Sequence, residues 1–261
     1  MFIDSHCHLN FDCFGDDREA LNSALQNANI NKLIIPGTDA KRWPEVAALA
    51  AQNVGFYYAL GIHPHFLDTF EEAQLSDLQS LLTEALAADN NKCVALGEIG
   101  LDKLITTELA EQEAVFLKQL AIAESLKLPV ILHVVKTQAR VLALLKQAKF
   151  SHGGVYHAFS GSVEVANEFI KLGFKLGLGG VITYPKSHKT RLTVSQLPLS
   201  CFVLETDAPD MPIYQQSEAY NSPLNLPIIF QSLCELRKES VQHVSAQIYD
   251  NTNLIFPLIN D

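Results

Sequence analysis

Short apolar runs alternate with amphipathic stretches along all 261 residues of this chain. Apolar runs of this length are typical of strands that are buried on both faces, as in parallel sheets. The strands predicted from them are Met1–Asp4, Lys32–Ile35, Gly55–Leu60, Cys93–Leu96, Val130–His133, Gly154–Ala158, Phe174–Leu178 and Cys201–Glu205. Because helical stretches lie between these runs, the pattern restricts the chain to the α/β class.

The stretches between the strands carry the helical repeat. In the stretch 107–126, for example, Phe116 and Leu120 fall on one apolar stripe of a helix, and Glu111 lies off that stripe. Helices are predicted at Thr107–Leu126, Trp43–Gln52, Leu75–Ala88, Ala139–Gln147, Val163–Leu172, Pro223–Lys238 and Val241–Asn253, and loops at Asn10–Asp17, Pro185–Thr190 and Asp210–Asn221. Eight strand–helix units predict a (β/α)8 TIM barrel, with an open doubly wound sheet as the alternative. No linker or repeat interrupts the pattern, so residues 1–261 are predicted to form a single domain.

Composition and charge narrow the function. Hydrophobic residues make up 48% and charged residues 18%, which is typical of a well-packed protein. The five cysteines include no CxxC pair, so neither a disulfide framework nor a zinc–thiolate site is predicted. A net charge of −10 argues against a protein that holds duplex nucleic acid along a basic stripe. Either the substrate is small or bound cations supply the attraction locally.

The location predicted from the sequence is cytoplasmic. The N-terminal residues lack the basic and apolar regions of a signal peptide. No run approaches the roughly 18 apolar residues that a membrane span needs. We expect no membrane partner and no obligate protein partner.

Polar side chains follow six of the predicted strands. His6 and His8 are two residues apart, so on an extended strand both point to the same face, and Cys7 points to the other. The remaining members are His63 and His65 after the third strand, Glu98 after the fourth, His133 and His157 in the fifth and sixth, and Asp207 after the eighth. Barrel enzymes place their chemistry at these carboxyl ends. Singly, His133 could be a core histidine and Asp207 a helix cap, but their shared position predicts a site.

The side chains in this set predict a metal centre. Imidazole and carboxylate together suit Zn²⁺, Mn²⁺, Ni²⁺ or Fe²⁺, and a site with more oxygen would admit Mg²⁺. Four histidines and two carboxylates exceed what one tetrahedral ion requires. Two divalent ions that share a carboxylate would use all six, and two-metal sites are suited to hydrolysing phosphate esters. His152, His188 and His243 are given no role.

Seven motifs occur in a fixed order along the chain. They are DSHCHL at 4–9, GIHPH at 61–65, GEIGLD at 97–102, LPVILH at 128–133, YHAFSG at 156–161, GLGGVITYP at 177–185 and ETDAPDMP at 205–212. In these motifs the chain resembles the TatD family of metal-dependent hydrolases, within the amidohydrolase-like barrels, and looks closest to its YjjV-like branch. The resemblance implies a TIM-like barrel and a divalent-metal hydrolase, which in several members is a deoxyribonuclease.

The resemblance also implies a role for each residue of the set. One ion is expected on His6, His8 and Asp207, a second on His133 and His157, with Glu98 as the bridge between them. Glu98 and Asp207 are the predicted catalytic residues, and Asp207 would orient a metal-activated water and accept its proton. His63 and His65 are expected to face the substrate or its phosphate. The segment 221–223 resembles one that borders the family's site.

Lys136 marks a departure from the family, which often has an arginine two or three residues after the fifth-strand histidine. A lysine can still meet a phosphate as a point charge, but it lacks the two-pronged contact of a guanidinium. Lys136 is therefore predicted to bind substrate.

The expected reaction is hydrolysis of a phosphoester, and DNA ends or short single strands are the expected substrates. Hydrolysis of an amide, lactone or cyclic amide on the same metal barrel is the alternative. The third hypothesis is a binding protein that has the same fold but does not catalyse a reaction.

Overall fold

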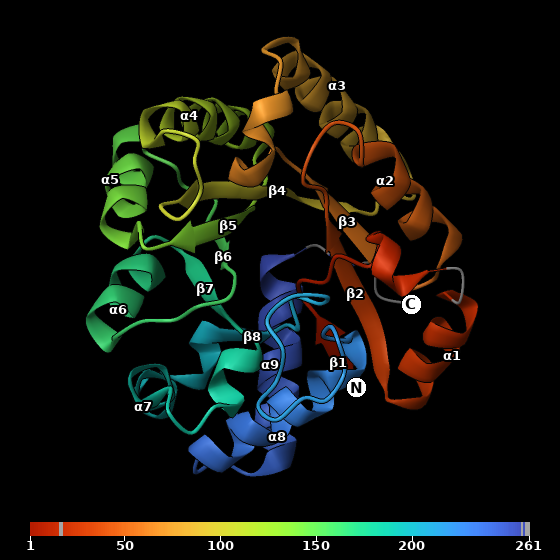
Figure 1. Cartoon of the computed structure of the whole chain (residues 1–261), viewed down its shortest axis with the longest axis vertical. Coiled ribbons are helices and arrows are strands. Elements are labelled where there is room, and N and C mark those ends of the chain that lie inside the picture. Colours follow the sequence, from red (N-terminus) through yellow and green to blue (C-terminus); the bar gives the residue numbers. More distant parts are fainter. Residues whose placement is uncertain (16–17, 257, 259–261) are drawn as a thin grey trace.

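The computed structural model describes residues 1–15, 18–256 and 258. Within them, eight parallel strands form one sheet in the order of the sequence. The strands are β1 Phe2–Asp4, β2 Ile30–Pro36, β3 Phe56–Leu60, β4 Cys93–Asp102, β5 Val130–Val135, β6 Gly154–Tyr156, β7 Phe174–Leu178 and β8 Phe202–Leu204. The helices are α1 Arg18–Asn27, α2 Trp43–Gln52, α3 Ala73–Ala87, α4 Leu109–Leu126, α5 Gln138–Ala148, α6 Val163–Lys171, α7 His188–Gln196, α8 Leu226–Leu236 and α9 Val241–Ile255. Figure 1 shows the helices α1 to α8 as a ring around the strands.

The sheet closes where β8 meets β1. The amide of Ser5 donates a hydrogen bond to the carbonyl of Leu204 at 2.9 Å, and the amide of Asp207 donates to the carbonyl of His6 at 2.9 Å. Each strand pairs in parallel with the next strand in sequence. The predicted (β/α)8 TIM barrel is confirmed, and the open doubly wound sheet is wrong.

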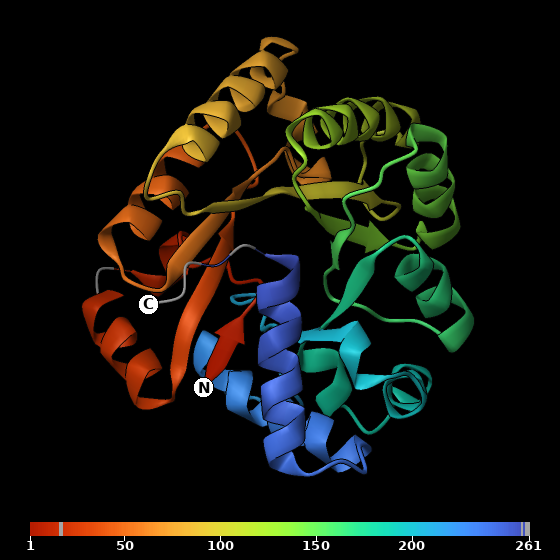
Figure 2. The same cartoon turned by 180° about the vertical axis from the view of Figure 1, so that it is seen from behind.

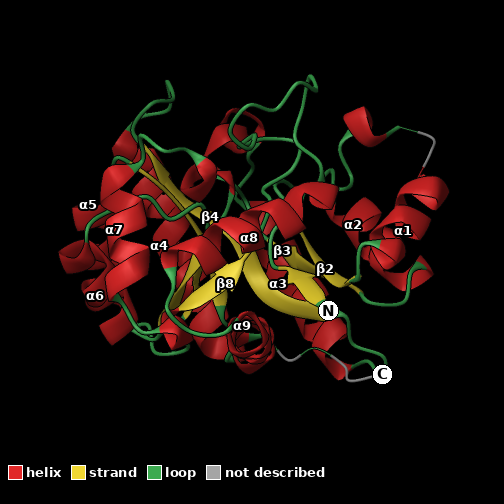
Figure 3. Cartoon of the chain, turned by 90° about the horizontal axis from the view of Figure 1, so that it is seen from below, coloured by secondary structure: helices red, strands yellow, loops and turns green. Residues whose placement is uncertain are grey.

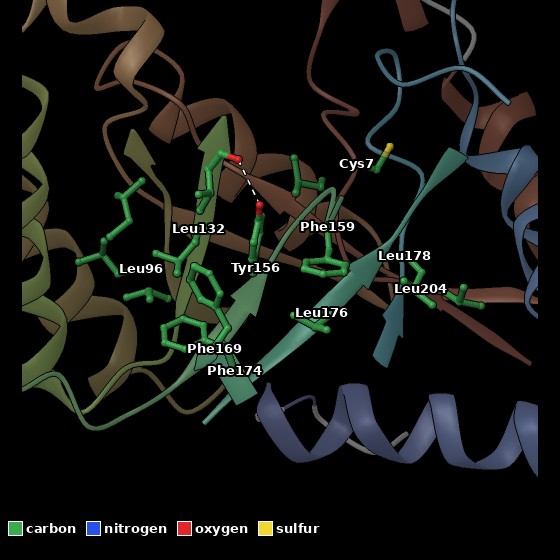
Figure 4. Packing of buried hydrophobic residues seen from close by; sticks show 14 of the residues in the cluster. Cys7, Leu96, Leu132, Tyr156, Phe159, Phe169, Phe174, Leu176, Leu178 and Leu204 are labelled. Carbon is green, nitrogen blue, oxygen red and sulfur yellow. Dashed lines mark hydrogen bonds between the residues drawn. The ribbon is translucent and has the colours of Figure 1, made fainter. Parts of the chain in front are cut away.

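Apolar side chains fill both the barrel and the layer around it. Inside, Ile3, Ile131 and Val203 belong to one buried cluster, to which Phe256 after α9 also belongs. Helix α9 crosses the end of the barrel from which the strands begin (Figure 2). The second cluster lies between the strands and the surrounding helices, and Figure 4 shows its members Leu96, Leu132, Tyr156, Phe159, Phe169, Phe174, Leu176, Leu178 and Leu204. Cys7 packs in this outer layer, so it faces away from the barrel interior as the alternation of a strand predicts.

Two helices were not predicted, and one loop prediction is partly wrong. Pro185–Thr190 was expected to be a loop, but α7 begins at His188 and buries Thr190 and Thr193. Because Thr190 and Thr193 are buried beside a single apolar residue, Val194, the sequence of this helix shows no apolar repeat. Helix α1 has a different cause: among its residues Leu25 alone is buried, and one residue cannot produce a repeat.

The predicted strand bounds differ from the structure mainly at β4, which continues from Leu96 to Asp102. Asp210–Asn221 contains no helix or strand, as predicted, whereas Asn10–Asp17 contains a short 3-10 turn and its residues 16–17 lie outside the described part. In the described segments, no helix combines the length and apolar character needed to cross a bilayer.

Candidate metal centre

The structure brings together all six residues that the sequence predicts as ligands. They come from the carboxyl ends of the strands, where the connecting loops gather on the side opposite to α9 (Figure 3). The six are His6, His8, Glu98, His133, His157 and Asp207. Their side chains are buried or nearly so, although each carries a polar or charged group.

The first cluster contains two imidazoles and two carboxylates. His6 Nε2 lies 3.2 Å from both His8 Nε2 and Glu98 Oε2, and 3.3 Å from Asp207 Oδ1. His8 Nε2 is 3.4 Å from the same Glu98 oxygen and 3.7 Å from Asp207 Oδ1. Donors held ~2.0–2.1 Å from a tetrahedral Zn²⁺ would lie about 3.3–3.4 Å from one another. The spacing of these four atoms fits one such ion.

The second cluster uses the other oxygen of Glu98. Glu98 Oε1 lies 2.6 Å from His157 Nε2 and 2.9 Å from His133 Nδ1, and these two nitrogens are 3.2 Å apart. Glu98 therefore presents one carboxylate oxygen to each cluster. This is the position that a carboxylate shared by two ions would occupy.

The pKa values of the site's histidines and of Glu98 also fit metal ions at these positions. Burial lowers the pKa of His6 to about 3, so its imidazole is neutral at neutral pH, as a ligand must be. Burial alone would raise the pKa of Glu98, but His157, His63 and His6 bring it well below its ordinary value. Burial alone would lower the pKa of His157, yet Glu98 and Asp207 raise it to about 10. The carboxylates thus favour positive charge between them, whether it is carried by an imidazolium or a metal ion.

Asp4 helps to hold His6 and Asp207, the first and last candidate ligands along the chain, close together. Its carboxylate accepts hydrogen bonds from the His6 amide at 3.2 Å, the Thr206 amide at 3.0 Å and the Thr206 hydroxyl at 2.6 Å. These bonds tie the end of β1 to the loop after β8. Asn221 supports the same loop, because its side chain donates to the carbonyls of Thr206 at 2.8 Å and Met211 at 3.1 Å.

Asp102 lies in the site, although no role was predicted for it. Its Oδ2 lies 3.0 Å from His133 Nε2 and 2.9 Å from His65 Nε2, and its Oδ1 accepts a bond from the Leu104 amide at 2.7 Å. The predicted strand ended at Leu96. A prediction that extended it to Asp102 would have included this residue, because Glu98 and Asp102 are four residues apart and share a face of an extended strand.

Glu205 is a second buried acid that the sequence left without a role. It accepts a hydrogen bond from the Ala158 amide and lies 3.9 Å from His157 Nδ1. Burial raises the pKa of its carboxyl group to about 8. The feature of the sequence that could have identified Glu205 is its place in the ETDAPDMP motif.

The two histidines that follow β3 occupy different environments. His63 is buried, its Nδ1 accepts a bond from the His65 amide at 3.1 Å, and its Nε2 lies 3.4 Å from Glu98 Oε1. His65 has a side chain 47% exposed and contacts Asp102. His63 Nε2 thus lies as near to Glu98 as His8 Nε2 does, beside the second cluster.

Two cavities open beside the clusters and share His133, His157 and Asp207. The smaller, about 150 Å³, is also lined by Phe11 and Phe66. The other, about 290 Å³, is lined by Val134, Val135, Lys136, Ala158 and Met211 among others. A cavity of about 600 Å³ next to α2 and α3 is larger, but its lining residues include no histidine or carboxylate. This cavity is therefore not the candidate site, although it is larger than the two beside the clusters.

A (β/α)8 barrel that gathers histidines and carboxylates at the ends of its strands is an architecture typical of metal-dependent hydrolases. Within this class the chain belongs to the TatD related DNase family, whose model matches residues 3–257. The resemblance inferred from the motifs is confirmed.

Individual relatives cover almost the whole chain. The uncharacterized metal-dependent hydrolase YjjV of Escherichia coli K12 is 40% identical over 256 residues, which span 98% of this chain and 97% of that protein. The crystal structure of YjjV, described as a TatD homologue, matches with a TM-score of 0.94 at 39% identity and covers 99% of this chain and 98% of that one. The 3′–5′ ssDNA/RNA exonuclease TatD of Cronobacter sakazakii is 31% identical over 252 residues, 93% of each protein.

Proposed function

We propose that the chain, acting as a single domain over residues 1–261, is a TatD-type deoxyribonuclease that hydrolyses phosphoester bonds at DNA ends or in short single strands. One observation carries the proposal: Glu98 presents Oε2 to one donor cluster and Oε1 to the other. Two ions that share a carboxylate are well suited to in-line displacement at phosphorus. The ssDNA/RNA exonuclease named among the relatives supports the substrate class. A cytoplasmic location remains part of this proposal.

The donor set divides between two ions. His6, His8 and Asp207 would hold the first, His133 and His157 the second, and Glu98 would contact both. When bound, divalent ions such as Zn²⁺, Mn²⁺, Mg²⁺ or Ni²⁺ would activate a water molecule and neutralise charge on the phosphoryl oxygens.

Asp207 is the proposed proton acceptor. Its Oδ1 lies 3.3 Å from His6 Nε2 and 3.9 Å from His157 Nδ1, inside the cavity lining. Burial raises the pKa of the Asp207 carboxyl group while no ion is bound, and a carboxylate placed beside the attacking water can accept its proton. The backbone hydrogen bond to the His6 carbonyl holds it in place to orient the attacking water.

His63, His65 and Lys136 are the proposed substrate contacts. Because His63 Nδ1 accepts the His65 amide, its ring hydrogen is assigned to Nε2, which can donate to a phosphoryl oxygen. Burial lowers the pKa of His63 to about 3, so it would donate as a neutral imidazole. The exposed His65 and Lys136 lie at the rims of the two cavities.

Asp102 is the proposed positioning residue for the second ion. A hydrogen bond from His133 Nε2 to Asp102 places the lone pair of the ring on Nδ1, which faces Glu98 and His157. We expect Asp102→Asn to weaken binding of the second ion by roughly 10–100-fold, the usual effect of losing such a partner. Calorimetric titration with Zn²⁺ measures this, and excess metal should restore turnover. An unchanged affinity would show that Asp102 does not position His133.

Lys136 tests how many phosphates the chain contacts. Lys136→Ala should lower phosphoester turnover only about two- to fivefold, as for a single exposed cation. Lys136→Arg should raise turnover through a two-pronged contact. The logarithm of oligonucleotide affinity should fall with that of salt concentration at a shallow slope, about −0.7 for each neutralised phosphate on a single strand. A steep slope, or loss of metal from Lys136→Ala, would contradict these roles.

A substrate panel tests the proposed reaction against its alternatives. The protein reconstituted with Mn²⁺ or Zn²⁺ is assayed on single-stranded DNA, simple phosphodiesters, lactones and cyclic amides. We expect metal-stimulated cleavage of the phosphodiesters. The apolar residues Val134, Val135 and Met211 in the larger cavity favour the lactone or amide alternative, and turnover confined to those substrates would support it. Binding without turnover would indicate a binding protein.

A further inference from the structure

Two phenylalanines frame one side of the mouth of the metal centre. Phe11 lies in the loop after β1, and Phe66 lies in the 3-10 turn Pro64–Thr69 after β3. Both line the cavity of about 150 Å³ that contains the clusters. The Phe11 ring stacks on the ring of His8, with centroids 4.9 Å apart and an angle of 21° between the planes. The Phe66 ring lies 6.1 Å from that of His63. Each phenylalanine thus contacts a histidine of the site.

Arg42 sits over both rings. Its Cζ lies 5.5 Å from the centroid of Phe11 and 4.8 Å from that of Phe66. Its Nη1 donates to Asp39 Oδ2, while Asp39 Oδ1 accepts the amides of Lys41 at 2.9 Å and Arg42 at 3.2 Å. The side chain remains 35% exposed. A guanidinium has five N–H donors, so the contact through Nη1 leaves others free to bind a ligand.

The size of the cavity places most of a substrate outside it. Pockets that bury a whole drug-sized ligand measure roughly 300–1,000 Å³, so a cavity of about 150 Å³ admits little more than the reacting group. The rest of the substrate lies outside this cavity, along its rim or in the adjoining cavity of about 290 Å³. On this side the rim offers two aromatic rings and a guanidinium, the chemistry that proteins use to hold unpaired bases and their phosphates.

We propose that Phe11, Phe66 and Arg42 form a subsite for the nucleotide next to the scissile phosphate of a single-stranded nucleic acid. The base packs against the half-buried ring of Phe66, and the phosphate of that nucleotide accepts hydrogen bonds from Arg42. This inference rests on the proposed phosphoester hydrolysis. It also gives a chain with a net charge of −10 a local anchor for a polyanion.

The test compares a strand with a substrate that has no neighbouring nucleotide. Arg42→Ala, Phe66→Ala and the milder Phe66→Leu are assayed on hexathymidylate and on methyl p-nitrophenyl phosphate, with thermal unfolding to check the fold. Stacking on an aromatic side chain accounts for about a tenfold change in affinity for each base. We therefore expect KM for hexathymidylate to rise about tenfold, and the loss of kcat/KM to be at least fivefold larger than on the small ester. Arg140→Ala, which removes an exposed arginine paired with Glu113 on the outer helices, is the matched control.

Equal losses on both substrates, or no loss on hexathymidylate, would overturn the subsite. A wild-type protein that cleaves neither substrate would contradict the proposed function instead. In that case the fluorescence anisotropy of labelled hexathymidylate, measured in a chelator, still decides between the two outcomes. Weaker binding by Arg42→Ala and Phe66→Leu than by Arg140→Ala supports the subsite. Equal binding by all three contradicts it.

Discussion

We expect Glu98→Gln to lower phosphoester turnover by roughly a thousandfold and to reduce the number of divalent ions held by each chain. Glutamine keeps the shape of the side chain, but it loses the charge that meets His6 at 3.2 Å and His157 at 2.6 Å. A metal ion contributes several kcal/mol to transition-state stabilisation, and each 1.36 kcal/mol is a tenfold change in rate. Steady-state kinetics and elemental analysis of the same preparation measure both effects.

The fold of this variant should be retained, because the side chain of Glu98 meets histidine side chains and the sheet is held by backbone hydrogen bonds. Glu113→Gln removes a carboxylate that pairs with Arg140 outside the site, and it serves as the matched control. Wild-type turnover by Glu98→Gln at saturating metal would refute the shared carboxylate.

Asp207→Asn has the second largest expected effect. An amide cannot accept the proton of the attacking water, and loss of a general base typically costs about 10²–10⁴-fold in rate. The variant should also hold the first ion more weakly, while the donors to the second, Glu98, His133 and His157, remain. We expect kcat to fall by that factor and to stay low when excess metal restores occupancy.

Asp68→Asn, at an exposed position in the turn after β3, controls for the loss of one acidic charge. Full recovery of kcat by excess metal would show that Asp207 only binds the ion. In that case another group would have to accept the proton.

The convergence of the six candidate ligands could be predicted from the sequence because these residues share a simple property. His133 ends an apolar run, and Glu98 and Asp207 each follow one. Parallel strands of a barrel bring such ends together. The prediction needed the order of the strands and no detail of side-chain packing.

Asp102 was missed for a local reason. The run after Leu96 contains two glycines and two acids, so the pattern predicted the end of the strand there. In the structure β4 continues to Asp102, and that acid reaches His133 on the neighbouring strand. Strand pairing at this point overrides the local sequence preference.

Arg42 was missed because three separate loops create its surroundings. Phe11 follows β1, Arg42 precedes α2, and Phe66 follows β3, so no spacing in the sequence links them. Helix α7 was missed because it buries Thr190 and Thr193, and an apolar repeat cannot reveal a helix of this kind.

A titration of metal-free protein with Mn²⁺, in which bound ions and cleavage of a short single strand are measured in the same samples, tests the shared-carboxylate centre most directly. We expect bound metal to rise to two ions per chain and cleavage to reach its maximum only as the second ion binds. The variant Glu98→Gln should bind no second ion and should not cleave the strand. Full cleavage with a single ion bound, or two ions bound without any cleavage of a phosphodiester, would contradict the shared-carboxylate centre.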